Sequence, residues 1–183
     1  MKYRFVICTM LLSVAGCGLN PPPAPRVPPL PKGPVTPVPK LAADDVPVLQ
    51  QINAHAAYMK SVATLAATHS DDDLIKGFAT QLARDYDKAH ASAQKLATTS
   101  NLTLLEKPSA LEQKRLTTLG RLYGRSFNRT FLYVVTHSYT MGERNRLVQV
   151  QKNGSTTDMK NLAGSALDLL DRCRIQGAGL VRR

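Results

Sequence analysis

The stretch FATQLARDYDKAHASAQKLA, residues 78–97, decides the fold of this chain. Apolar side chains recur in it at intervals of three and four residues, the spacing of one face of an α-helix. The pattern predicts a helix that begins after the acidic triplet 71–73 and runs to about Thr99. Its inward stripe consists of Ile75, Phe78, Leu82, Tyr86, Ala89, Ala93 and Leu96.

The residues before this stretch predict a second long helix. It should begin at Asp44 or Asp45, with Pro47 in its first turn, and end at His69-Ser70. Its apolar positions have the same helical spacing, which places them on one face. The inward stripe is Leu49, Ile52, Ala56, Met59, Ala63 and Ala66.

The residues after the stretch predict three more helices. Ser109 and Glu112 have capping-box spacing and begin a short helix that ends near Gly124. Ser126 is expected to cap one long helix that stops at 153–154, and Ser155 to cap the last one, which frays after Gly177. The inward residues are Leu116, Leu119, Tyr123, Phe127, Phe131, Val134, Val135, Tyr139, Leu147, Met159, Leu162, Ala166, Leu169 and Cys173.

Residues 44–183 show no convincing strand alternation, so the sequence predicts an all-α domain. Four long amphipathic helices and one short helix, joined by short turns, form a four-helix bundle with an additional short helix.

The chain begins with the features of an export signal. Lys2 and Arg4 precede the apolar run 5–12, and small residues precede Cys17. An aliphatic residue, two small residues and a cysteine resemble the bacterial lipobox. The resemblance implies that residues 1–16 are removed as a signal peptide and that Cys17 carries covalent lipid. A soluble signal peptide, cut nearby, is the alternative.

Residues 17–43 are expected to form a tether between this anchor and the domain. Ten of the twelve prolines lie between positions 21 and 39, in PPPAPRVPPLPKGPVTPVPK (21–40). Such density excludes helix and favours extended polyproline II. The segment is interpreted as a semi-rigid spacer, with a ligand for a proline-recognition module as the alternative.

Four stretches of the helical domain resemble one protein family. They are LQQINAHAAYMKSVATLA (49–66), FATQLARDYDKAHASAQKLA (78–97), FNRTFLYVVTHSYTMGERNRLV (127–148) and DMKNLAGSALDLLDRC (158–173). Their order and spacing are similar to those of domain of unknown function 4142, a family of exported, ferritin-like bacterial proteins. The resemblance therefore implies a ferritin-like four-helix bundle.

The same resemblance implies carboxylate and imidazole ligands for a metal at four helix positions. In this chain those positions hold Met59, Tyr86, Tyr139 and Cys173. A metal site is therefore not expected, and no cofactor other than the lipid is predicted. The alternative is a divergent metal-binding or redox protein that uses some of Asp85, His90, His137 and Tyr139.

No catalytic motif is found in the sequence, so an enzyme is not expected. The chain has a net charge of +11, with 24 Lys and Arg against 13 Asp and Glu. Five basic residues cluster without an intervening acid, and we name them the basic surface. They are Lys114, Arg115, Arg121, Arg125 and Arg129.

This cluster has two interpretations, a solvated surface or a contact with an anionic partner. The partner would be phospholipid, lipopolysaccharide, acidic polysaccharide or an envelope protein. Nucleic acid is disfavoured, because the chain is expected to be exported and lacks an aromatic stacking platform.

Together these features predict a lipid-anchored protein of the cell envelope with a non-enzymatic binding or structural role. Its domain would lie in the periplasm. The resemblance to bacterial lipoproteins, in which an Asp after the cysteine retains the protein in the inner membrane of enteric bacteria, implies the outer membrane for this chain, where that residue is Gly18.

Overall fold

The computed structural model describes residues 40–106 and 108–181, and the regular elements of this part of the chain are all α-helices, without a strand. The prediction of an all-α bundle is confirmed. The signal peptide, Cys17 and the proline-rich segment lie outside the described residues. The helices are α1 (Asp45–His69), α2 (Asp73–Thr99), α3 (Ala110–Leu119), α4 (Gly124–Thr136), α5 (Met141–Asn153) and α6 (Thr157–Val181).

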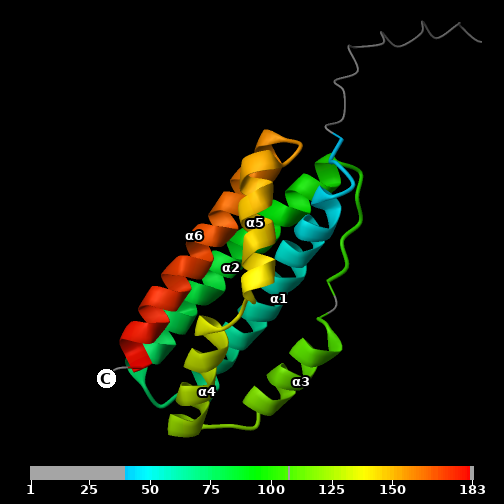
Figure 1. The fold of residues 1–183 in the computed structure, drawn as a ribbon. Coiled ribbons are helices and arrows are strands. Elements are labelled where there is room, and N and C mark those ends of the chain that lie inside the picture. Colours follow the sequence, from blue (N-terminus) through cyan, green and yellow to red (C-terminus); the bar gives the residue numbers. More distant parts are fainter. Residues whose placement is uncertain (1–39, 107, 182–183) are drawn as a thin grey trace, which may run out of the picture. The chain divides into compact units, whose positions relative to one another are not determined.

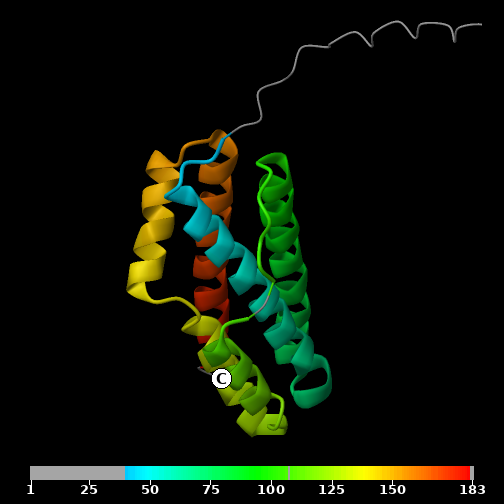
Figure 2. The same ribbon diagram turned by 90° about the vertical axis from the view of Figure 1, so that its right-hand side faces the viewer.

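Three long helices and a pair of shorter ones form the bundle (Figure 1). α1 and α2 are antiparallel neighbours, while α4 and α5 follow one another along α6. α3 lies outside the bundle, at the end of a connection that runs back over α1 (Figure 2). Two hydrogen bonds from the Gln50 side-chain amide hold this connection against α1. The amide donates to the backbone carbonyl of Leu105 at 2.7 Å and accepts from the backbone N–H of Leu105 at 3.0 Å.

The predicted inward stripes form the core. All six stripe residues of α1 are at most 3% exposed, and five of the seven in α2 are buried. The core has two parts, one around Phe127 and Phe131 and one around Leu147 and Met159. Burying so many apolar groups supplies the main driving force for folding, at about 25 cal/mol for each Å² removed from water.

The prediction of one long helix from Ser126 to Asn153 is wrong. The chain leaves the helix after Thr136 and begins a new one at Met141. The new start is a capping box: the Thr140 hydroxyl accepts from the N–H of Glu143, and the Glu143 carboxylate accepts from the N–H of Thr140. Thr140 thus satisfies backbone groups that an uninterrupted helix would have bonded internally.

The predicted start of this region is also wrong, because α4 begins two residues before Ser126, at Gly124. Gly124 has a φ of 55°, in the left-handed region that favours glycine. A β-carbon there would lie 3.1 Å from the Asp71 carboxylate. The short helix before it ends at Leu119 rather than near Gly124, and Tyr123 is not inward but 65% exposed.

The last helix differs from the prediction at both ends. The Ser155 hydroxyl donates to Asp45 at the start of α1, while the hydroxyl of Thr156 accepts from Met159 N–H and caps α6. The helix does not fray after Gly177 but continues to Val181. Gly177 is buried where a β-carbon would lie 2.7 Å from the Thr136 side chain, so α6 packs closely against the end of α4.

Among residues 40–106 and 108–181, none of the helices combines the length and the apolar character that crossing a membrane requires.

Candidate functional site

A buried polar cluster lies inside the bundle, and four elements contribute to it. His55 comes from α1, Tyr86 from α2, Tyr139 from the connection between α4 and α5, and Cys173 from α6. His55 is the centre: its ring packs edge-on against Tyr139 and Tyr86, with ring centroids 4.2 and 5.6 Å apart. The Tyr86 hydroxyl lies 3.5 Å from His55 Nε2 and 4.0 Å from Cys173 Sγ.

Burial keeps every member of this cluster uncharged near pH 7. It lowers the pKa of His55 to about 3 and raises the pKa of the Cys173 thiol to about 11. Burial likewise raises the pKa of Tyr86 and of Tyr139 above that of an ordinary phenol. A protonated thiol is a poor nucleophile, and neutral phenols are poor metal ligands. The cluster is therefore a packed group of neutral polar side chains.

The sequence predicted three members of this cluster and missed the fourth. Tyr86, Tyr139 and Cys173 were expected to face inward, and the prediction is confirmed, although Tyr139 is only half-buried. The central residue, His55, was not singled out. A signal was present, because His55 follows Ile52 by three residues and precedes Met59 by four, on the apolar stripe of its helix.

The four candidate metal ligands are not brought together. Asp85 faces α6 and lies 3.7 Å from Arg172, His90 lies 3.8 Å from Glu106, and His137 is exposed at the end of α4. Only Tyr139 belongs to the buried cluster. In the described part of the chain, no three His, Cys, Asp or Glu side chains lie close enough together to hold a metal ion.

The basic surface occupies α3, the connection after it and α4. All five of its side chains are exposed. None of them lies within 4.0 Å of a carboxylate in the described residues, so their charges face solvent. Five large apolar side chains are exposed on the same or adjoining elements, in α3, the α3–α4 connection and the ends of α2, α4 and α6. They are Leu74, Leu111, Tyr123, Tyr133 and Val181.

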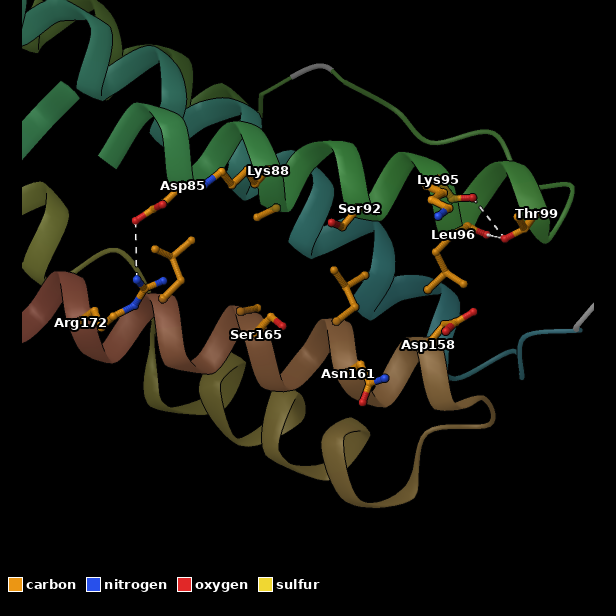
Figure 3. Close-up of a pocket in the computed structure, with 14 residues that line it drawn as sticks. Asp85, Lys88, Ser92, Lys95, Leu96, Thr99, Asp158, Asn161, Ser165 and Arg172 are labelled. Atoms are coloured by element: carbon orange, nitrogen blue, oxygen red, sulfur yellow. Dashed lines mark hydrogen bonds and ion pairs between the residues drawn. The ribbon is translucent and has the colours of Figure 1, made fainter. Parts of the chain in front are cut away.

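A shallow groove of about 450 Å³ runs between α2 and α6 (Figure 3). Asp85 and Arg172 face one another across it at one end, while Thr99 and Asp158 lie toward the other. Short side chains such as Ser92 and Ser165 line its middle. Its charged side chains include the Asp85–Arg172 ion pair at 3.7 Å, and no nucleophile lies beside a general base among its lining residues.

A comparison with known proteins identifies the family. The family described as "Domain of unknown function (DUF4142)" matches residues 30–174, which is most of the chain, so the chain belongs to it. The resemblance recognised in the four helical stretches is thereby confirmed. No curated protein matches the chain, and no solved structure does.

Proposed function

We propose that this protein is a lipid-anchored, non-enzymatic binding protein of the cell envelope whose basic surface contacts an anionic membrane. The five basic side chains of α3, the connection after it and α4 carry the proposal, because they are exposed and none lies within 4.0 Å of a carboxylate in the described part of the chain. Cationic side chains near an anionic lipid surface each contribute about 1 kcal/mol of attraction. The lipobox-like residues before Cys17 support the anchor, and the proline-rich segment supports a tether.

The apolar side chains around the basic surface favour a lipid partner over a polysaccharide. Tyr123, Tyr133 and Leu74 expose more than half of their surface on the elements that carry or adjoin the arginines. Aromatic and aliphatic groups beside basic residues are typical of surfaces that enter the headgroup region of a bilayer. A soluble acidic polymer would offer no apolar region to bury them.

A vesicle-binding experiment tests the contact separately from the anchor. The full chain with Cys17→Ser is mixed with vesicles of anionic or of zwitterionic lipid, across a salt series. We expect binding to the anionic vesicles that weakens as salt screens the charges. The triple variant Arg115→Glu, Arg121→Glu, Arg129→Glu should lower the affinity by about a hundredfold.

A matched triple variant controls for net charge. Arg84→Glu, Arg146→Glu and Lys152→Glu change exposed residues of α2 and α5 and alter the net charge by the same amount. If both triples weaken binding equally, or if binding is indifferent to salt, the basic surface is not the contact. Tighter, salt-dependent binding to an acidic polysaccharide than to the vesicles would contradict the lipid partner.

Two further measurements test the anchor and the absence of a metal role. Cys17→Ala should move the protein from the membrane fraction to the soluble fraction of cells. Metal analysis of protein purified without chelator should find no stoichiometric iron or manganese. A stoichiometric metal would instead favour the alternative, a divergent metal-binding protein.

A further inference from the structure

A second hollow, of about 850 Å³, lies at the end of the bundle where the α1–α2 connection, α4 and the end of α6 meet. This is the end opposite to the start of α1, where the described chain begins (Figure 1). Its volume is within the range of about 300–1,000 Å³ that small-molecule sites occupy in proteins. The hollow is thus large enough for a lipid headgroup and the first part of its chains.

Charges of both signs line this hollow without neutralising one another. Arg125 and Arg129 of α4 lie on it, as do Asp71 of the α1–α2 connection and Asp73, the first residue of α2. Neither arginine lies within 4.0 Å of an aspartate of the hollow, so these charges form no ion pairs with one another. The hollow therefore offers two separate cations and two separate anions to a ligand.

The hydrogen bonds and ion pairs that Asp71 and Asp73 already make leave both carboxylates able to bind a cationic group of a ligand. Asp72, the middle residue of the triplet, is committed, because its carboxylate caps α2. Asp71 uses one oxygen to accept from the Asn128 amide at 2.7 Å. Asp73 has a 96% exposed side chain, and among the described residues its one ion pair is a 3.5 Å contact with Lys76. Such an exposed pair contributes little to stability.

Apolar side chains complete the lining. Leu74, Tyr133 and Val181 each expose more than half of their surface and line the same hollow. A ligand that matches all of these groups has an anionic part that binds the arginines, a cationic part that binds the aspartates and an apolar part that contacts the exposed apolar side chains.

We propose that this hollow binds a membrane phospholipid whose headgroup joins a phosphodiester to a primary ammonium. The guanidinium groups of Arg125 and Arg129 would donate to the phosphate oxygens. The ammonium would donate to the carboxylates of Asp71 and Asp73, and the acyl chains would lie against the exposed apolar side chains. A quaternary ammonium has no N–H to donate, so a choline headgroup would bind less well.

This site goes beyond the electrostatic contact proposed above, because its ligand has no net charge. Vesicles without anionic lipid therefore test it separately. The full chain with Cys17→Ser is titrated with vesicles of phosphatidylcholine alone and of phosphatidylcholine with phosphatidylethanolamine. We expect about tenfold tighter binding to the ethanolamine vesicles, the effect of one or two charge-assisted hydrogen bonds.

Paired variants test which residues produce the tighter binding to ethanolamine vesicles. Asp71→Asn with Asp73→Asn should abolish it, while the amide oxygen at position 71 can still accept from Asn128. The matched control, Asp158→Asn with Asp168→Asn, removes two exposed acids of α6 and should leave the preference intact. Arg125→Gln should weaken binding to both vesicles, whereas Arg84→Gln on α2 should not.

Three results would overturn the proposal: equal binding to the two vesicles, an unchanged preference in the Asp71/Asp73 variant, or equal losses in the control pair. Soluble glycerophosphoethanolamine, added at the concentration of the lipid, should not displace the protein from ethanolamine vesicles. Displacement at that concentration would make the ligand a free phosphodiester and contradict a membrane site. Failure of the anionic-vesicle experiment would leave this preference standing.

Discussion

The buried cluster around His55 and the basic surface of α3 and α4 use polar residues in opposite ways. The cluster is enclosed by four elements, and burial holds its imidazole, phenols and thiol in their neutral forms. The basic side chains are exposed and lack carboxylate partners among the described residues. The comparison assigns stability to the bundle interior, and the proposed membrane contact to one end of the bundle.

The largest expected effect tests whether the interior provides stability. Met59 is 0% exposed in the core part that contains the cluster, so Met59→Ala should lower the free energy of unfolding by about 2–5 kcal/mol. Urea denaturation measures the change. Met141→Ala, at a position that is 74% exposed, is the matched control and should change stability by less than about 0.5 kcal/mol. Equal effects would mean that the described core is wrong.

The next effect concerns pH and the neutral state of His55. Burial lowers the pKa of His55 from its ordinary value of 6.5 to about 3, so between these pH values the unfolded state binds a proton that the folded state does not. The free energy of unfolding is therefore highest above pH 6.5. It decreases as the pH falls toward 3, and at pH 4 it is lower by about 3 kcal/mol.

Urea denaturation at pH 7 and at pH 4 checks this dependence. His55→Leu should remove most of the difference between the two pH values. The exposed His137→Gln should leave it unchanged. A pH dependence that survives His55→Leu would show that another group titrates.

A smaller effect is expected at the break between α4 and α5, which connects the two regions. Thr140→Ala removes the cap of α5 and should cost about 1 kcal/mol of stability. Thr98→Ala, which removes an exposed hydroxyl bonded only within its own helix, should have little effect. If the two variants are equally stable, the capping box does not hold the break in place.

The smallest effect on stability is expected at the basic surface. Arg129→Glu should change the free energy of unfolding by less than about 0.5 kcal/mol, because the side chain is exposed and unpaired in the described structure. The same variant should weaken binding to anionic vesicles about tenfold or more. A large loss of stability would contradict the separation of roles between the two regions.

The helices of the first half were predictable because their information is local. The stripes of α1 and α2 have the spacing of one helical face, and the start of α3 has its capping box within four residues. The break before Met141 was missed although its capping box is equally local, because the apolar spacing continues from Phe131 to Leu147 across it.

The sequence by itself determined the helical class, the inward faces and the uneven distribution of charge, since each depends on neighbours along one chain. The tertiary structure alone decided that His55, Tyr86, Tyr139 and Cys173 meet, and that two arginines and two aspartates line one hollow. These residues come from helices and connections far apart in the sequence. Their distances, and the burial that shifts the pKa values of the cluster, are set by how the helices pack.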